Sequence, residues 1–355
     1  MNYIWSKKSL LDFLYNSITS VIKRKDFVFS DLFAWTWIVG RYFKEKWHKI
    51  IANDLQYYSF VLNKNYIENH KILPFYGLEK EIPWLFTADW HHTQQIVLDY
   101  LNNLPQKEGF IYKNYAPGGT KWKEFERMYF TDENAKKCDV IRIKIEKWKK
   151  DNKITENEYY FLLASLLESI DKVANTASVY GAFLKNFKKS AKVLMVLQSA
   201  EFYLNNYEHQ VFNEDVNKLI LEISHNVVYL DPPYNHRQYN WNYHLLETIA
   251  KYDNPKIKWK TWMRIDPEKK SMFCSRTEVK KSFKFLIDNI KAKYVFLSYN
   301  DEWLMNLDDI KEIMSSRWEY WVFTKEYRRF KADKTENRNH KKDSVIEYLH
   351  YVKIN

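Results

Sequence analysis

Glycine is the residue that this chain most clearly lacks. It occurs 6 times in 355 residues, whereas about 7% is usual in globular proteins. Glycine supplies positive φ angles and lets a backbone approach a ligand closely, so tight loops here depend on other residues. Tryptophan, in contrast, occurs 14 times, and its positions become informative below.

Cysteine and long apolar runs are scarce as well. The two cysteines, Cys138 and Cys274, are too far apart in sequence to indicate a disulfide framework or a cysteine metal site. No apolar run approaches the roughly 18 residues of a membrane helix, and the N-terminus lacks a signal-peptide pattern. His236 and His244 have no partners at ligand spacing, so we expect no metal. A cytoplasmic protein is the expectation.

Basic residues are in excess, 56 against 45 acidic ones, which gives a net charge of +11. This balance suits a polyanionic partner, but it is also typical of many basic soluble proteins. Part of the excess lies between residues 256 and 284, which predicts a loop that contacts phosphates. Within it, Arg264 and Arg276 are the candidates for directed hydrogen bonds.

One stretch organises the chain. Residues 226–235 read Asn-Val-Val-Tyr-Leu-Asp-Pro-Pro-Tyr-Asn, and the apolar, β-branched run at 227–230 predicts a buried strand. The two prolines that follow cannot continue a strand or a helix. Polar residues are thereby held on a stiff turn at the carboxyl end of a strand, where open α/β sheets bind ligands; they are Asp231, Tyr234 and Asn235.

Asp231-Pro232-Pro233-Tyr234 after a buried strand resembles the catalytic motif of the N6-adenine DNA methyltransferases. An adenine amino nitrogen is a poor nucleophile because its lone pair is delocalised into the ring. The resemblance implies that the carboxylate of Asp231 and the carbonyl of Pro232 each accept one amino hydrogen. Tyr234 would stack on the base after it flips out of the duplex. Enzymes that methylate the cytosine amino group usually carry Ser at this Asp, so Asp231 favours adenine.

A second pattern indicates a cofactor site near the N-terminus. A strand at 27–31, a tight loop at 32–37, a helix through Phe43 and a strand at 48–54 form the dinucleotide-type half-fold. The acid that ends it, Asp54, would bind ribose hydroxyls. An acid at a strand end also serves as a helix cap or lies in solvent, and the sequence leaves these alternatives open.

The loop at 32–37 resembles the family's first motif, Asp-Leu-Phe-Ala-Gly-Thr-Gly, with Trp35 and Trp37 at the two glycines. Two indoles there would fill the space of S-adenosylmethionine, the cofactor that the resemblance implies. In the family, the opening segment lies beside this cofactor and an acid before the catalytic strand contacts its adenine; Asp215 could equally be a helix N-cap. The implied cofactor residues are Trp5, Lys7, Asp31, Phe33, Ala34, Trp35, Asp54 and Asp215.

Tryptophan also stands at other turn-like or family-glycine positions, namely Trp5, Trp47, Trp259, Trp262, Trp303, Trp318 and Trp321. Random drift would not select glycines so consistently. We therefore hypothesise that the host reads UGA codons of this gene as glycine, and that they stand as tryptophan in the sequence as printed. Trp148 lies in an amphipathic helical run and is expected to be genuine.

Between about residues 70 and 205 the sequence no longer predicts alternating strands and helices. Helices are predicted at 135–150 and 156–173, and the first carries a basic face that is either solvated or a DNA contact. The segment resembles the family's target-recognition insertion, with boundaries near Pro74 and Asn205. Its candidates for DNA contact are Arg127, Asn175 and Lys185. After the catalytic turn, Asn235, Tyr239, Tyr243 and His244 could line the pocket for the flipped base, although Tyr243 could equally be core.

The sequence thus predicts an α/β, Rossmann-like methyltransferase fold with a mixed seven-stranded sheet, completed by terminal strands at 320–330 and 344–352. Residues 1–70 and 206–355 would form the catalytic domain and 71–205 a mainly helical insertion. The implied activity is methylation of adenine in duplex DNA within a restriction–modification system; a cognate endonuclease stays open. The rivals are a degenerate fold that binds DNA but no cofactor, if Trp35 and Trp37 are genuine, and an RNA methyltransferase.

Overall fold

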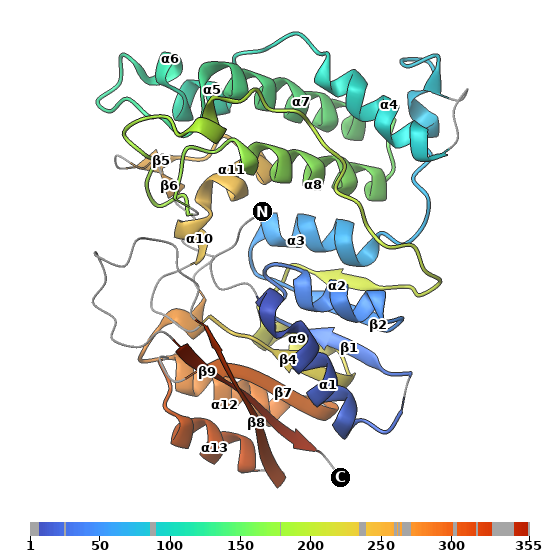
Figure 1. Ribbon diagram of the computed structural model, residues 1–355, viewed down its shortest axis with the longest axis vertical. Helices are drawn as coiled ribbons and strands as arrows, with labels where there is room; N and C mark the ends of the chain where they lie inside the picture. The colour runs from blue at the N-terminus through green and yellow to red at the C-terminus, as the bar shows by residue number, and fades with distance from the viewer. Residues whose placement is uncertain are drawn as a thin grey trace. The chain divides into compact units, whose positions relative to one another are not determined.

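The structure is a computed structural model of the whole chain (Figure 1). It describes residues 7–24, 26–85, 90–177, 179–233, 239–258, 261, 263–264, 271–300, 304–316, 319–328 and 344–353. Within these residues every helix is too short or too polar to cross a membrane.

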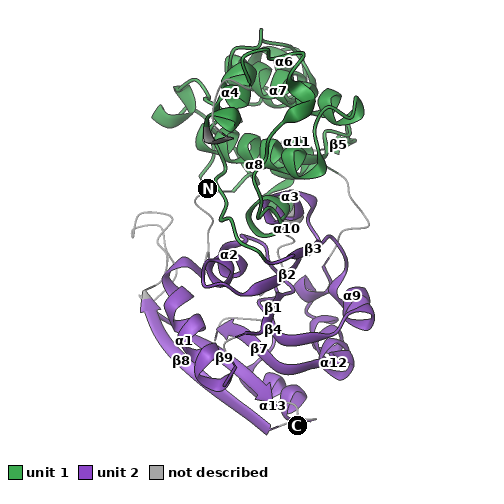
Figure 2. Cartoon of the chain, turned by 90° about the vertical axis from the view of Figure 1, so that its right-hand side faces the viewer, with its two compact units in different colours: residues 1, 64–206, 241–266 green, residues 2–63, 207–240, 267–355 purple. Residues whose placement is uncertain are grey.

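The chain folds into two compact units, coloured separately in Figure 2. We call residues 2–63, 207–240 and 267–355 the sheet unit, and residues 64–206 and 241–266 the helical unit. The helical unit differs from the predicted insertion at 71–205, because residues 241–266 pack with it as well. This second segment carries an amphipathic helix, α11 (His244–Lys251), whose buried face completes the core of the helical unit.

The sheet unit contains a seven-stranded sheet within the described residues, in the order β3-β2-β1-β4-β7-β9-β8. The strands are β1 (Val28–Asp31), β2 (Lys49–Asn53), β3 (Gln210–Phe212), β4 (His225–Leu230), β7 (Ala292–Asn300), β8 (Glu319–Arg328) and β9 (Ser344–Lys353). All neighbours pair in parallel except β9, which is antiparallel to both β7 and β8. The predicted mixed sheet and its terminal antiparallel pair are confirmed.

The side chains of β4 show why this segment forms a central strand. Val228 and Leu230 face a cluster built with α9 (Val216–Glu222), α12 (Val279–Asn289) and α13 (Leu307–Ser315). Tyr229 points to the opposite face, where its ring lies 5.9 Å from that of Phe29. Since both faces of the strand are buried, the run is apolar throughout instead of alternating.

Helices and 3-10 turns make up the rest of the sheet unit within the described residues, and helices lie on both faces of the sheet (Figure 1). They are η1 (Lys7–Leu10), α1 (Leu11–Val21), α2 (Ile38–Glu45), α3 (Tyr57–Asn63), α9 (Val216–Glu222), η6 (Met272–Cys274), α12 (Val279–Asn289) and α13 (Leu307–Ser315). The chain order reverses between β1 and β4, because β2 and β3 lie on one side of β1 and β4 lies on the other. Such a switch point opens a crevice at the carboxyl ends of the two strands.

The helical unit is built around two long helices. Thr131 caps α7 (Asp132–Lys150), and Thr155 forms a capping box with Glu158 at the start of α8 (Glu156–Lys172), which fixes both starts. The remaining segments are η2 (Lys64–Glu68), η3 (Tyr76–Leu78), α4 (Trp90–Asn102), α5 (Phe110–Tyr115), α6 (Pro117–Thr120), η5 (Lys189–Lys192), β5 (Ile257–Lys258) and β6 (Met263–Arg264), while α10 (Tyr239–Asn242) spans the boundary.

Arg142 of α7 ties the second segment of the helical unit to the first. It is 1% exposed, and it donates from Nε to the carbonyl of Ile249 at 3.0 Å and from Nη2 to that of Ala250 at 3.0 Å. These are carbonyls of the last turn of α11, which have no partner within their own helix. A guanidinium therefore caps α11 from a different helix.

We predict that Arg142→Met destabilises the protein by about 2–4 kcal/mol, because the buried carbonyls of α11 lose their charged donor. Thermal unfolding followed by circular dichroism measures the effect. Lys147→Met on the same helix is the control; Lys147 is exposed, so its replacement should change stability by less than about 0.5 kcal/mol. Equal melting temperatures for both variants would contradict the capping role.

Candidate active site

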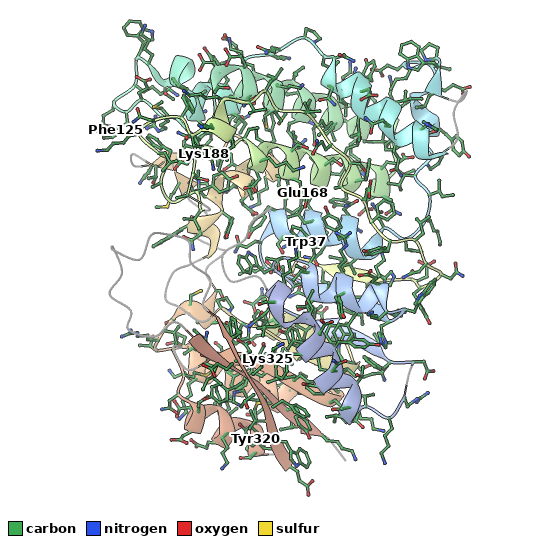
Figure 3. The ribbon with its side chains drawn as sticks, viewed as in Figure 1. Trp37, Phe125, Glu168, Lys188, Tyr320 and Lys325 are labelled. Atoms are coloured by element: carbon green, nitrogen blue, oxygen red, sulfur yellow. The ribbon has the colours of Figure 1, made fainter. Side chains whose placement is uncertain are left out.

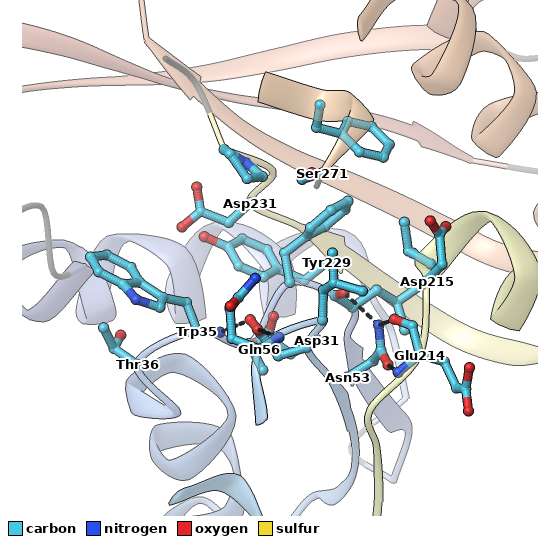
Figure 4. A pocket seen from close by; sticks show the side chains of 18 of the residues that line it. Asp31, Trp35, Thr36, Asn53, Gln56, Glu214, Asp215, Tyr229, Asp231 and Ser271 are labelled. Atoms are coloured by element: carbon cyan, nitrogen blue, oxygen red, sulfur yellow. Dashed lines mark hydrogen bonds between the residues drawn. The ribbon is translucent and has the colours of Figure 1, made fainter. Parts of the chain in front are cut away.

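A cavity of about 1020 Å³, part of it open to solvent, lies at the carboxyl ends of β1, β2 and β4 in the sheet unit. Its wall is completed by the turn before α9 and by η6. This is the switch point of the sheet, so the fold places the cavity where the sequence predicted a ligand. Figure 4 labels Asp31, Trp35, Asp215 and Asp231 among the side chains around it. The lining residues also include Lys7, Phe33 and Asp54.

Asp231 follows β4 directly and lines the cavity. Its Oδ1 lies 3.3 Å from Nζ of Lys7, which in turn lies 2.5 Å from Oε1 of Glu347 on β9. Lys7 and Glu347 are buried, with side chains 8% and 0% exposed, while 17% of the Asp231 side chain remains accessible. The catalytic candidate is therefore one end of a buried chain of three charges.

Burial raises the pKa of Asp231 to about 6; Lys7 opposes this shift and Glu347 adds to it. Burial alone would lower the pKa of Lys7, but the carboxylates of Asp231 and Glu347 outweigh it and raise that pKa overall. Lys7 is therefore charged throughout the ordinary pH range. Asp231 changes its charge near neutrality, in the range where a small change in surroundings decides its state.

Asp54 closes the loop after β1 through hydrogen bonds to backbone N–H groups. Its Oδ2 accepts from the N–H of Trp35 at 2.9 Å, and its Oδ1 accepts from that of Gln56 at 2.7 Å. The carbonyl of Trp35 also accepts from Oγ of Ser59 at 2.8 Å. The acid at the end of β2 thus fixes the shape of the cavity wall and stands at its edge.

Asn53, the last residue of β2, joins three loops and was missed by the sequence analysis. Its Nδ2 donates to the carbonyls of Leu32 at 3.3 Å and Glu214 at 3.2 Å, and its Oδ1 accepts from the N–H of Glu214 at 3.0 Å. Figure 4 shows the pair with Glu214. The side chain is 1% exposed. A single amide therefore holds the loops after β1, β2 and β3 at fixed distances around the cavity.

Asp31 and Asp215 line the same cavity. Asp31 is 2% exposed, and burial together with the nearby charges of Asp231 and Asp54 raises its pKa well above the usual range. Asp215 caps α9, since it accepts from the N–H of Asn217 at 2.8 Å. The helix-cap alternative for Asp215 is confirmed, and its position at the cavity is compatible with the cofactor contact that stays a prediction.

The two tryptophans of the cofactor loop differ from expectation. Trp35 lines the cavity, with its indole N–H donating to the hydroxyl of Tyr58 at 2.8 Å, whereas Trp37 is buried outside the set of lining residues. Figure 3 labels Trp37 on its loop. The expectation that both indoles fill the cofactor space is therefore wrong for Trp37, which does not line the cavity, while Trp35 does.

Trp37 and Trp47 stand where glycine is usual. Trp37 precedes α2 with φ 51°, and Trp47 follows α2 with φ 63°. At Trp47 the N–H of His48 bonds the carbonyl of Phe43 at 3.1 Å, and the N–H of Trp47 bonds that of Lys44 at 3.0 Å, which is the Schellman ending that favours glycine. The Trp47 side chain is 62% exposed, so burial does not offset the strain.

Trp148 behaves in the opposite way. It is fully buried in α7, and its indole N–H donates to Oε2 of Glu81 at 3.0 Å. Its packing and its satisfied donor agree with the expectation of a genuine tryptophan. Of the other glycine-like positions, Trp321 lies on β8 and is 39% exposed; the rest, Trp5, Trp259, Trp262, Trp303 and Trp318, lie outside the described residues.

Several predicted site residues cannot be located. Trp5, Tyr234 and Asn235 lie outside the described residues, and only the backbone of Tyr239 is described, within α10. Phe33 and Ala34, on the loop after β1, line the cavity, and so does Pro233 after β4. Pro232 is buried and is not among the lining residues. Arg276 is exposed in the sheet unit, as a phosphate contact requires.

Other candidates belong to the core of the helical unit. Tyr243 and His244 are buried, and Nε2 of His244 lies 2.8 Å from the carbonyl of Tyr180; burial lowers the pKa of His244 to about 4. The structure therefore favours the core alternative for Tyr243. Arg264 is buried and binds both carboxylate oxygens of Asp253, at 3.1 and 2.8 Å. Its guanidinium is committed to that acid, which contradicts a phosphate contact.

The DNA-contact candidates Arg127 and Asn175 are also turned inward. Arg127 is 1% exposed, and its Nη1 donates to the carbonyl of Phe125 at 2.8 Å. Asn175 is fully buried and donates from Nδ2 to the carbonyls of Met128 and Leu184. Both predictions are wrong, because each side chain satisfies loop carbonyls. Lys185 is exposed, and its contact with DNA stays a prediction.

The sequence of this chain is similar to those of known DNA methyltransferases. The model of the D12 class N6 adenine-specific DNA methyltransferase family matches residues 3–314. Type II methyltransferase M.NlaIII of Neisseria lactamica is 48% identical over 99% of this chain and 99% of its own. Type II methyltransferase M.CviAII of Paramecium bursaria Chlorella virus 1 is 35% identical over 100% of this chain and 98% of its own. Type II methyltransferase M.FokI of Planomicrobium okeanokoites is 36% identical, and 99% of this chain spans 52% of its length.

The described residues form a seven-stranded sheet in which the strand next to one edge, β9, is antiparallel, and a cavity lies at the switch point of this sheet. Together with the family match, these features define an α/β methyltransferase domain. The chain belongs to the D12 class N6 adenine-specific DNA methyltransferase family. It is thus an enzyme of DNA methylation, and the family assignment made from Asp231-Pro-Pro-Tyr234 is confirmed.

We predict that Asn53→Ala lowers the stability of the protein by about 1–3 kcal/mol, since one buried and two part-buried backbone groups lose their partner. The loops around the cavity should also become more accessible to hydrogen exchange. Asn16→Ala is the control, because Asn16 is exposed on α1, and it should leave both readouts unchanged. Normal exchange in the loops of Asn53→Ala would contradict their dependence on this amide.

Proposed function

We propose that this chain is a site-specific methyltransferase that transfers a methyl group from S-adenosylmethionine to the N6 amino group of an adenine flipped out of duplex DNA. The supporting observation is the placement of Asp231 after β4, beside the cavity at the switch point. The names of relatives, type II methyltransferases and modification methylases, support a host-protecting role, alongside an endonuclease that acts on the same site.

The cavity suits S-adenosylmethionine in the charge of its lining, which includes Asp31, Asp54 and Asp215. The Oδ1 of Asp31 is buried without a hydrogen-bond partner among the described residues. A buried acceptor of this kind favours a cationic ligand, and S-adenosylmethionine carries an ammonium and a sulfonium group. Asp54 and Asp215 would face its ribose and adenine.

The bound cofactor supplies an activated methyl group. The residues of this chain act on the other reactant: the ionised carboxylate of Asp231 and the carbonyl of Pro232 each hold one amino hydrogen of adenine. As the nitrogen–carbon bond forms and the carbon–sulfur bond breaks with its electron pair left on sulfur, these two acceptors would stabilise the positive charge on the nitrogen, and the carboxylate of Asp231 would take up the amino proton that is released. Pro232 and Pro233 keep the acceptors in place because they restrict the backbone of the turn. Tyr234 stacks on the flipped base.

The decisive variant is Asp231→Ala. Transfer of a labelled methyl group to duplex DNA should fall by at least about 10²–10³-fold, because the developing charge loses its stabilisation, while DNA binding in a mobility-shift assay should persist. Asp288→Ala, at an exposed position of α12, is the control and should remain active. Full activity of Asp231→Ala would refute the proposal, and preferential labelling of RNA in a competition would favour an RNA methyltransferase instead.

We also propose that the protein made by its own host carries glycine at positions 35, 37 and 47. A bulky residue in the left-handed region costs roughly 1–2 kcal/mol, and two of these tryptophans adopt it. Position 35 lines the cavity, so glycine there would let the backbone approach the cofactor closely. Glycine at all three positions matches the resemblance at 31–37 and the Schellman ending of α2.

Two measurements test this. Mass spectrometry of the peptide from Asp31 to Arg41, purified from the host, should find glycine at 35 and 37. In recombinant protein, Trp47→Gly should raise stability by about 1–2 kcal/mol because it relieves the strain, whereas Trp148→Gly should lower it by about 3–5 kcal/mol because it empties the core. Tryptophan in the host peptide would disprove the recoding.

A further inference from the structure

Glu347 is a buried acid in a position that the fold would otherwise fill with an apolar residue. It lies on β9 between Val345 and Leu349, which share its face of the strand and are buried. Its side chain is 0% exposed, and it is not among the residues that line the cavity. Burial of a carboxylate is costly unless it is paired, and a well-packed apolar residue often serves stability better. Its presence therefore indicates a task other than stability.

The contacts of Glu347 show what that task is. Its Oε1 lies 2.5 Å from Nζ of Lys7 and 2.5 Å from Oγ of Ser298 on β7. Nζ of Lys7 lies farther, 3.3 Å, from Oδ1 of Asp231. A lysine side chain is flexible, with three rotatable donors on a compact charge. Glu347 and Ser298 are fixed on neighbouring strands, so they determine where this charge stands relative to Asp231.

We propose that Glu347 is a positioning residue of the methyltransferase: by holding Lys7, it prevents the ammonium from closing fully on Asp231 and so keeps that carboxylate available to accept an amino hydrogen of adenine. The expected effect of Glu347 on catalysis rests on the proposed function. The sharing of Lys7 between Asp231 and Glu347 does not, because it is a property of the protein without substrates.

The charge balance explains the effect. With Lys7 protonated and both acids ionised, the three groups carry a net charge of −1, so Asp231 retains part of its basicity. Without the charge of Glu347, Lys7 and Asp231 would form a neutral pair in which the carboxylate binds the lysine more tightly. The other titratable groups of the described residues that act on this cluster come from β1, β4 and β8; they are Asp31, Tyr229 and Tyr327.

The test begins with Glu347→Gln, which keeps the size of the side chain and removes its charge. Carbon-13 NMR of the aspartate carboxyls, assigned with Asp231→Asn, reports the titration of Asp231. Its pKa, about 6 in the unaltered protein, should fall by about one unit or more, because Lys7 is then free of Glu347 and pairs more closely with the carboxylate of Asp231. The acidic limb of the pH–kcat profile should move down equally, and kcat at its plateau should fall about tenfold with an unchanged KM for DNA.

Glu326→Gln is the matched control, because Glu326 is exposed on the adjacent strand β8, and it should leave the titration and kcat unchanged. Lys7→Met and the double variant Lys7→Met/Glu347→Gln complete a cycle. Glu347→Gln is thus compared in two backgrounds, with Lys7 present and with Lys7 replaced by Met. If Glu347 acts through Lys7, the substitution should shift the pKa of Asp231 much less in the second background than in the first. The double variant leaves no unpaired lysine, so it remains informative should Glu347→Gln fail to fold.

An unchanged pKa of Asp231 in Glu347→Gln, or equal effects in the presence and absence of Lys7, would overturn the inference. Failure of the unaltered protein to methylate DNA would refute the proposed function instead, and the NMR titration would still decide how Glu347, Lys7 and Asp231 interact.

Discussion

The ion pair between Lys7 and Asp231 is the interaction on which the candidate site depends. A carboxylate at the end of a buried parallel strand would take up a proton if it stood alone, because burial disfavours its charge. Lys7 opposes that tendency from the N-terminal end of the chain, and Glu347 limits its influence from β9 near the other end. In the sheet only β7 lies between β4, which Asp231 follows, and β9, which carries Glu347. Lys7 of η1 lines the same cavity as Asp231. The distant parts of the sequence thus set one local charge.

Backbone loops form much of the wall of the cavity beside this cluster. Asn53 ends β2 and Asp54 follows it, and their side chains form hydrogen bonds with main-chain groups of the loops after β1 and β3. A loop that approaches a ligand closely would be expected to use glycine, yet Trp37 and Trp47 adopt positive φ on either side of α2. Polar side chains hold the loop backbone around the cavity in place, and two tryptophans adopt strained backbone angles beside it.

The helical unit shows how easily a polar residue is mistaken for a ligand contact. Arg127, Asn175 and Arg264 have the side chains that bind DNA in other proteins, but here they satisfy loop carbonyls or a neighbouring acid. The loops of this unit leave many backbone carbonyls without partners in regular structure, and buried guanidinium and amide groups donate hydrogen bonds to these carbonyls. The segment 241–266 belongs to the same unit for a related reason, because α11 needs both an apolar partner and a cap for its last turn.

The sequence by itself determined the family, the fold class and the place of the Asp231-Pro-Pro turn after β4, because these depend on local patterns: an apolar strand, two prolines that end it, and an acid at the end of a second strand. It also located most of the cavity, since carboxyl ends of parallel strands share one edge of a sheet. Only the tertiary structure showed that Glu347 reaches Lys7, that Asn53 joins three loops, and which basic residues are buried. Those facts depend on pairs of residues far apart in sequence, and whether a polar side chain faces solvent or a carbonyl is decided by packing that no local pattern records.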